Sequence, residues 1–122
     1  MRVAISADEN SGLASRVNPH FGRCPFFVFV DLNGRVVTNV EVRPNPYYGQ
    51  HQPGEVPAFI RAQGANVMLT GGMGARAVAF FQECGIEPIT GAFGTAQQAL
   101  SAYLNGELTG AGACRESLEH GH

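Results

Sequence analysis

The second half of the chain alternates twice between an apolar run, a glycine turn and a helix-forming segment. Asn66–Thr70 and Ile86–Thr90 have the composition of short buried strands, and glycines follow each of them directly. When strands and helices alternate in this way, the strands lie parallel in one sheet and right-handed crossovers connect them. The pattern therefore predicts an α/β fold with helices at about 55–63, at Ala75–Cys84 and from Thr95 onward.

The first half of the chain predicts three further strands. Arg2–Ala7 is apolar on both faces, as a strand that is covered on two sides requires. Asn33-Gly34 separates Phe26–Leu32 from Arg35–Val42 and predicts a type I′ hairpin, because Asn-Gly accepts positive φ at both turn positions. In the second hairpin strand the alternation puts four residues on one face: Val36, Thr38, Val40 and Val42. The whole pattern predicts a mixed five-stranded sheet that is covered by about three helices.

Single residues mark where these elements begin and end. Thr95, with Gln98 three positions later, has the pattern of a capping box at the start of a helix. Gly64 is placed to end the first helix, and Pro88 indicates that the last strand lies at an edge of the sheet.

Composition limits the classes of partner. The 122 residues carry a formal net charge of −2, which fits one domain without a basic field for nucleic acid. All basic residues are arginines, which suit contacts to an anion, although genomic base composition explains this equally well. Three cysteines make no disulfide framework, and no apolar stretch is long enough to cross a bilayer. We therefore expect a cytoplasmic protein with no membrane partner, with its α/β domain at 1–108 and a flexible C-terminal tail at 109–122.

Three loops are expected to form a binding site. In open α/β sheets, ligands bind beyond the carboxyl ends of the parallel strands. Residues 8–24, Gly71–Gly74 and Gly91–Gly94 follow such ends, and the two glycine turns lead into helix N-termini, which favour anions. The simpler interpretation is that these glycines only permit tight turns. Neither turn ends in the Lys-Ser/Thr of a nucleotide-binding P-loop.

The segment from His20 to Pro25 carries the chemistry of the predicted site. His20 offers an imidazole nitrogen and Cys24 a soft thiolate, both suited to copper, iron or zinc. Gly22 would let the backbone approach a bulky ligand, and Arg16 and Arg23 could neutralise negative charge. Spacing alone does not make a closed zinc site, because structural zinc takes four ligands.

The other histidines and cysteines have plainer interpretations. Cys84 is expected in the core beside two phenylalanines, and His51 in a surface loop that could also cover the site. The remaining candidates lie in the expected tail, where they are solvated or act as adventitious metal ligands: Cys114, His120 and His122.

The motifs together resemble the dinitrogenase iron–molybdenum cofactor-binding family, which includes cofactor carriers of nitrogenase assembly and a molybdenum–copper orange protein. The resemblance covers about residues 1–108, and the matching pieces are Met1–Asp8, Asn18–Pro25, Phe26–Asp31, Thr70–Ala77 and Gly91–Ala96. It implies a ribonuclease-H-like fold without nuclease activity, and binding of an anionic molybdenum- or iron-containing sulfide cluster, either Mo-Cu-S or Fe-Mo-S.

The resemblance also implies roles for particular residues. His20 matches a family histidine proposed to contact the cofactor, whereas Cys24 matches a position that is often a small residue such as alanine. Many members end in a cysteine followed by paired histidines, and the tail of this chain matches that in part. The residues expected to bind the cluster are His20, Phe21, Gly22, Arg23, Gly71, Gly72, Met73, Gly74, Gly91, Ala92, Phe93 and Gly94, with His20 and Cys24 as metal ligands.

Three functional hypotheses follow. The leading one is a cluster carrier or storage protein that is not an enzyme. The second is an interaction or regulatory module for a P-loop ATPase or a cluster-assembly enzyme, with Phe21 and the 47–51 loop as the docking patch. The third is a hydrolase of phosphoryl substrates, which lacks a recognisable set of catalytic carboxylates.

Overall fold

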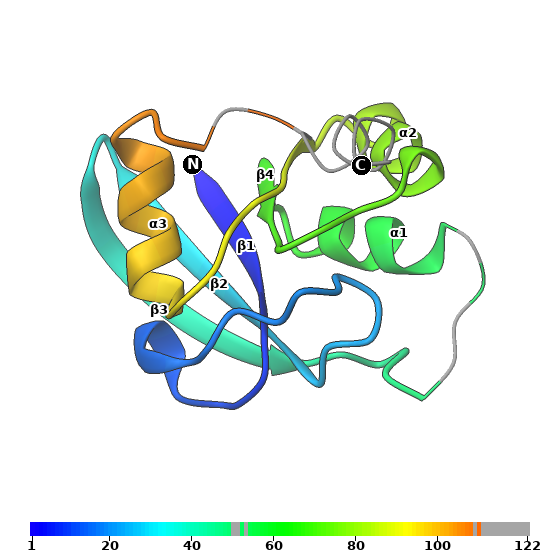
Figure 1. Ribbon diagram of the computed structural model, residues 1–122, viewed down its shortest axis with the longest axis horizontal. Helices are drawn as coiled ribbons and strands as arrows, with labels where there is room; N and C mark the ends of the chain where they lie inside the picture. The colour runs from blue at the N-terminus through cyan, green and yellow to red at the C-terminus, as the bar shows by residue number, and fades with distance from the viewer. Residues whose placement is uncertain (50–51, 53, 109, 111–122) are drawn as a thin grey trace.

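The computed structural model describes residues 1–49, 52, 54–108 and 110, and it confirms the mixed five-stranded α/β sheet (Figure 1). The strands are β1 (Arg2–Ala7), β2 (Phe26–Asn33), β3 (Val36–Pro44), β4 (Val67–Leu69) and β5 (Glu87–Ile89), in the spatial order β3-β2-β1-β4-β5. The helices of the described part are η1 (Gly12–Ala14), a 3-10 turn, and α1 (Glu55–Ala62), α2 (Ala75–Glu83) and α3 (Ala96–Leu104). None of the described helices is long and apolar enough to span a bilayer.

The parallel half of the sheet forms as the alternation predicts. β4 pairs parallel to β1 on one side and to β5 on the other, and β5 with Pro88 is an edge strand. Because β1, β4 and β5 run in one direction, their carboxyl ends reach the same edge of the sheet. β2 and β3 complete the sheet as antiparallel strands beside β1.

The sheet has a hydrophobic core on each face, and β1 contributes to both. Along β1, Val3 and Ile5 pack on the face that α3 covers, whereas Ala4 packs on the face that α1 and α2 cover. Each core buries large side chains completely, such as Ile89 with α3 and Phe81 with α2. Figure 1 shows α3 on one side of the sheet and α1 and α2 on the other.

The hairpin differs from its prediction by one residue. β2 continues through Asn33, which pairs with Val36, so the two-residue loop is Gly34-Arg35. Gly34 has a φ of 63°, but no residue other than glycine has a positive φ in the described part of the chain. A positive φ at the first loop position alone is the arrangement of a type II′ turn, so the type I′ prediction was wrong.

A β-bulge in β3 corrects the predicted alternation. The pairing jumps from Asp31–Asn39 to Leu32–Val37, which leaves Thr38 as the extra residue. Val37 therefore joins Val40 and Val42 on the predicted face, in place of Val36 and Thr38. A bulge also twists an edge strand, and this discourages pairing with other chains.

The helix boundaries agree with the sequence. Thr95 and Gln98 form the expected capping box at the start of α3. Gly64 follows α1 with a φ of 83°, as a glycine that ends a helix requires. Of the segment expected as a tail, only Gly110 is described, and its carbonyl accepts a hydrogen bond from the Thr90 N–H at 3.0 Å.

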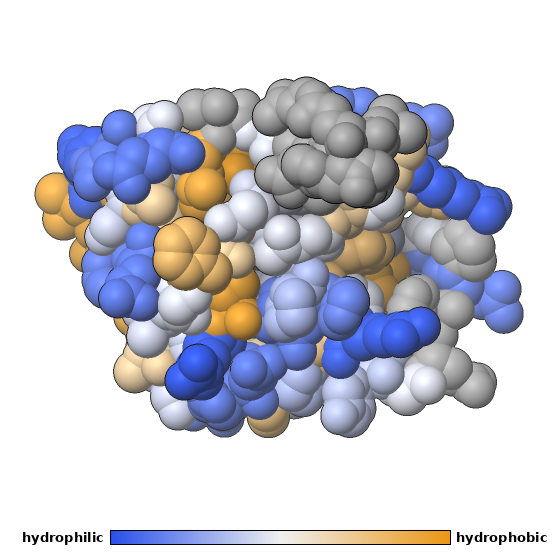
Figure 2. Space-filling model, viewed as in Figure 1, coloured by the Kyte–Doolittle hydropathy of each residue, from blue (hydrophilic) through white to orange (hydrophobic). Residues whose placement is uncertain are grey.

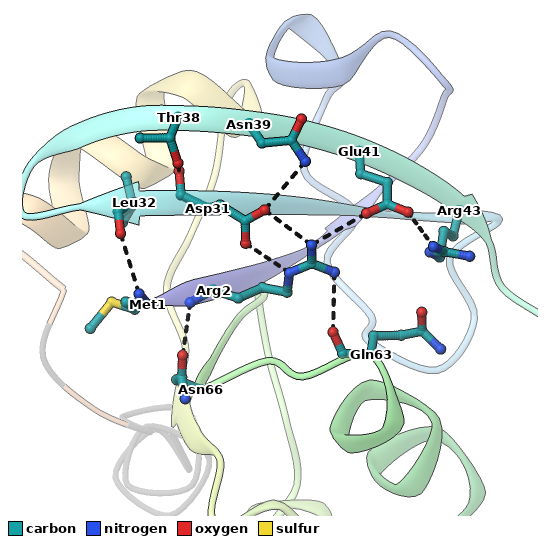
Figure 3. A network of polar contacts seen from close by, with 10 residues as sticks. All are labelled: Met1, Arg2, Asp31, Leu32, Thr38, Asn39, Glu41, Arg43, Gln63 and Asn66. Carbon is teal, nitrogen blue, oxygen red and sulfur yellow. Dashed lines mark hydrogen bonds and ion pairs between the residues drawn. The ribbon is translucent and has the colours of Figure 1, made fainter.

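Arg2 holds together the end of the sheet where the parallel strands begin (Figure 3). Its guanidinium donates to both oxygens of Asp31 on β2, at 2.8 and 3.0 Å, and to Glu41 on β3, at 3.3 Å. It also donates to the carbonyl of Gln63 after α1, and its backbone N–H donates to the Asn66 side chain. One side chain at the start of β1 thereby links two strands to the end of a helix.

We expect Asp31→Asn to lower the free energy of unfolding by about 1 kcal/mol at pH 7, because a two-pronged arginine–carboxylate pair is lost. Hydrogen bonding to Arg2 holds the pKa of the Asp31 carboxyl below its usual 3.8. The stabilisation is therefore complete above pH 3.8 and is lost as the pH falls through the lowered pKa. Urea unfolding at pH 7 and at pH 3 measures this, and the deficit should shrink at pH 3.

Glu83→Gln is the matched control, because Glu83 has no ion pair among the described residues. It should leave stability at pH 7 within about 0.5 kcal/mol of the parent. An Asp31→Asn deficit that is equal at both pH values would contradict the ion-pair explanation.

Candidate functional site

Three loops converge at the carboxyl ends of β1, β4 and β5 and enclose a hollow of about 900 Å³. In Figure 1 these are the blue loop after β1, the green turn after β4 and the yellow turn after β5. Figure 2 shows the same face, which is pale and of intermediate hydropathy across its middle. The hollow is lined by Pro19, His20, Phe21, Gly22, Arg23, Gly71, Gly72, Met73, Gly74, Gly91, Ala92 and Phe93.

The loop that carries His20 is attached directly to the first glycine turn. The Gly72 N–H donates to the Pro19 carbonyl at 2.9 Å, and His20 pairs with Gly72 as a short parallel bridge. A Cβ on Gly71 would lie 2.7 Å from the Cα of Pro19, closer than real side chains come to a backbone atom. Gly71 is therefore required by close approach.

The close approach at Gly71 is a different reason for glycine after β4 from the one that the sequence suggested. We expected a tight turn that needs glycine dihedral angles, but none of Gly71, Gly72 and Gly74 has a positive φ. In the second turn, Gly91 and Gly94 do have positive φ values, of 88° and 79°. In the first turn Gly71 is needed for space, whereas Gly91 and Gly94 of the second turn are needed for backbone conformation.

The second glycine turn is tied to both other loops. The Gly91 N–H donates to the Gly71 carbonyl, and the Ala92 N–H donates to the Thr70 carbonyl, each at 3.1 Å. The Val17 N–H donates to the Gly94 carbonyl at 2.8 Å. Each loop is thus hydrogen-bonded to the other two, which fixes the shape of the hollow.

Two buried hydroxyl groups lie beneath the hollow. Ser6 Oγ donates to the Asn18 carbonyl at 2.8 Å and lies 2.9 Å from Thr70 Oγ1, and both hydroxyl-bearing residues are fully buried. The Asn18 side chain donates to Asp8 and accepts from the His20 N–H at 2.8 Å. Asn18 therefore sets the backbone position of His20. From the sequence we expected neither Ser6 nor Asn18 to support the loop that carries His20, although Asn18 lies within the matching motif.

The lining has a positive bias. Among the described residues that line the hollow, Arg23 is the one permanently charged side chain and none is a carboxylate. The described residues contain no group of three or more histidine, cysteine or acidic side chains that could hold a metal ion. His20 is exposed and is the sole imidazole among the described residues of the lining, so these residues offer a ligand one metal–nitrogen bond, together with charge and shape.

The two helix N-termini differ from the expectation that both present free N–H groups. At α3 the capping box uses the N–H groups of Thr95 and Gln98, and the Ala96 N–H donates to the Ser15 carbonyl. At α2 the N-cap is Gly74, which lines the hollow and provides no side-chain cap. Only α2 therefore directs an uncapped positive end toward the hollow.

Cys24 lies in the core and does not line the hollow. Its side chain is fully buried among the residues that α1 and α2 cover, and its thiol donates to the Phe21 carbonyl at 3.4 Å. Burial raises the pKa of this thiol to about 12. A metal ligand needs the thiolate at neutral pH, so this environment is opposite to the one expected of a metal-binding cysteine.

The structure brings together all of the residues expected at the site except Gly94 and Cys24. Gly94 supports the loop through its carbonyl, as described above. Pro19 lines the hollow although it was not expected there. Phe93 stands at the rim with 80% of its surface exposed. Four of the weaker candidates lie outside the described residues: His51, Cys114, His120 and His122.

The fold and the glycine-lined hollow define an α/β protein with a binding site at the carboxyl edge of its sheet. The chain belongs to the family described as "Dinitrogenase iron-molybdenum cofactor", which matches residues 1–106. The resemblance expected from the motifs is thereby confirmed. Family membership and the hollow together support a cofactor-binding or carrier role.

The chain is similar to several known proteins, two of them with solved structures of the same fold. The chain is 43% identical to PH0822, with a TM-score of 0.79 and coverage of 89% of this chain and 95% of that one. It is 30% identical to the orange protein of Desulfovibrio gigas, solved in its apo form, with a TM-score of 0.81 and coverage of 92% and 93%. It is also 28% identical to MJ0580 of Methanocaldococcus jannaschii, an uncharacterized protein, over 88% of this chain and 89% of the relative.

We expect Gly71→Ala to cost about 1–3 kcal/mol of stability, because the added methyl group overpacks the contact with the Pro19 backbone. Gly74→Ala is the matched control in the same turn, since a Cβ there meets nothing within 4 Å and its φ is −75°. Urea unfolding measures both, and the Gly74 variant should stay within about 0.5 kcal/mol of the parent. Equal costs at the two positions would contradict the role of close approach.

Proposed function

We propose that this protein binds and carries an anionic, molybdenum-containing sulfide cluster in the hollow, as a carrier or storage protein and not as an enzyme. The observation that carries the proposal is a glycine-lined hollow of about 900 Å³, whose described lining includes Arg23 and His20 and contains no carboxylate. The family description names an iron–molybdenum cofactor. The cluster is the cargo of the protein in this proposal.

Charge and space favour a bulky anion. Arg23 and the uncapped N-terminus of α2 both supply positive potential to the hollow. Glycine at many lining positions keeps side chains away, so a cluster several atoms wide contacts the backbone and the apolar surfaces of Met73 and Phe93. Sulfide ligands are soft and polarisable, and such contacts suit them better than they suit a hard phosphate oxygen.

His20 supplies the one metal bond in this proposal. An imidazole nitrogen is a suitable ligand for copper, iron and similar metals. The Asn18 side chain fixes the backbone of His20, and the exposure of His20 leaves the ring accessible. A single replaceable ligand, together with non-covalent contacts, is what a carrier needs in order to release its cargo intact.

The alternatives have less support at this site. A phosphoryl hydrolase needs converging carboxylates or bound metal ions, whereas the described lining contains no acid. Cys24 is left out of the proposed ligand set because it is buried and its thiol is protonated at neutral pH. We expect the carrier to act in the cytoplasm, where its sparse cysteines stay reduced.

Reconstitution tests the carrier directly. We expect the protein, mixed with tetrathiomolybdate and a copper salt, to leave gel filtration as a coloured complex with a fixed ratio of molybdenum to protein. His20→Ala should weaken retention of the cluster about tenfold or more, because outer-shell changes at metal sites already cost that much. Absorbance and elemental analysis of the protein peak measure both effects.

Two controls separate binding from folding. His20→Ala should keep the urea midpoint of the parent, since its side chain is exposed. Arg23→Gln should weaken retention, whereas Arg61→Gln, which removes the same charge from the last turn of α1, should not. A colourless parent protein, or His20→Ala retention equal to that of the parent, would contradict the proposal.

A further inference from the structure

A second, smaller cleft lies beside the hollow, between the first turns of α1 and α2. Its volume is about 260 Å³, and a cavity of about 150 Å³ already holds benzene. It shares Phe21 and Gly74 with the hollow, so that one aromatic side chain forms a wall of both. The cleft is lined by Phe21, Gln52, Gly54, Val56, Pro57, Gly74, Arg76, Ala77 and Phe80.

The walls of the cleft are mainly apolar and rigidly placed. The ring of Phe21 packs edge-on against the buried Phe81, with centroids 5.5 Å apart. Val56 and Pro57 are buried in the first turn of α1. Phe80 closes the far side, 3.4 Å from the position that a Cβ on Gly54 would take. An apolar side chain of a partner would find preformed walls here, which lowers the entropic cost of binding.

The charge at the cleft indicates the kind of partner. Arg76 is the one charged residue of the lining, and its guanidinium lies 5.9 Å from the centre of the Phe80 ring. Among the described residues, Arg76 makes no ion pair, and the first turn of α2 has no acidic residue. Glu55 of α1 does not line the cleft, and its carboxylate accepts a hydrogen bond from the Gln52 N–H at 2.5 Å. The cleft therefore offers apolar walls and, at its rim, a cation that no described carboxylate neutralises.

We propose that this cleft is a docking site for a partner protein, and that its occupant is an aromatic or leucine side chain on an acidic segment. The apolar side chain fills the cleft between Val56 and Phe80, and a neighbouring carboxylate pairs with Arg76. A partner held there lies one side chain away from the hollow. It is therefore placed to deliver or receive the cargo, a consequence that rests on the proposed function, whereas the docking itself does not.

An acidic peptide with one phenylalanine, acetyl-Glu-Asp-Phe-Asp-Glu-amide, is the probe. Added to the full ¹⁵N-labelled chain, it should shift the amide signals of Val56, Ala77 and Phe80 in proton–nitrogen correlation spectra. Affinity should fall about tenfold or more for Arg76→Gln and for Phe80→Ala, as for residues at the centre of an interface. Arg61→Gln, the matched loss of charge on α1, should bind as the parent does.

Peptide controls identify the chemistry. Replacing the phenylalanine by serine, or the acids by lysines, should abolish the shifts. Equal affinity of the Arg76→Gln variant and the parent would overturn the proposal. So would shifts confined to Gly91 and Phe93, because the peptide would then be an anion in the larger hollow. Self-association of the parent in sedimentation that Phe80→Ala removes would also overturn it, by making a second copy the occupant.

Cluster retention separates this proposal from the proposed function. Phe80 does not line the larger hollow, so Phe80→Ala should bind tetrathiomolybdate and copper as the parent does while losing the peptide. A parent that binds the peptide but no cluster would leave the docking site standing and contradict the carrier. A parent that binds the cluster but not the peptide would contradict the docking site and leave the carrier function standing.

Discussion

The contact between Pro19 and Gly71 is the constraint on which the site depends. Only a residue without a side chain lets the loop after β1 approach the turn after β4 so closely, and the Gly72 N–H then bonds to the Pro19 carbonyl. His20 follows in the chain and pairs with Gly72, so its position is a consequence of this contact. The hydroxyl groups of Ser6 and Thr70 support the same junction from below. Without it, the loop that carries His20 would be joined to the glycine turns through the turn after β5, by the Val17–Gly94 hydrogen bond.

The two ends of the sheet are held together by different kinds of contact. Where the parallel strands begin, the Arg2 guanidinium joins two carboxylates and a helix end in one hydrogen-bonded network. Where these strands end, backbone hydrogen bonds hold the loops together, and Arg23 has no carboxylate beside it among the described residues of the lining. The ion pairs of the described residues thus all lie away from the site, and the positive charge of Arg23 remains for a ligand. Arg76 at the smaller cleft likewise makes no ion pair among the described residues.

Much of this fold could be predicted from the sequence, because periodicity, glycine turns and the Thr95–Gln98 capping box are local signals. The convergence of the three loops was also predictable, since it follows from parallel strand direction. The turn at Gly34-Arg35 and the bulge at Thr38 were missed because strand register is set by pairing between strands. The interior position of Cys24 was missed for a similar reason, because the sequence of the loop from His20 to Cys24 does not show which side chains point into the core. The backbone hydrogen bonds between the loops could not be predicted either, because their partners are distant in sequence.

The central claim is that the cluster occupies the hollow between His20 and the glycine turns. Crystals of the protein loaded with tetrathiomolybdate and copper, measured at the molybdenum absorption edge, test it most directly. The account predicts one strong anomalous peak per chain inside the hollow and close to Arg23, with the cluster bonded to the His20 imidazole. An anomalous peak elsewhere on the chain, with an empty hollow, would contradict it.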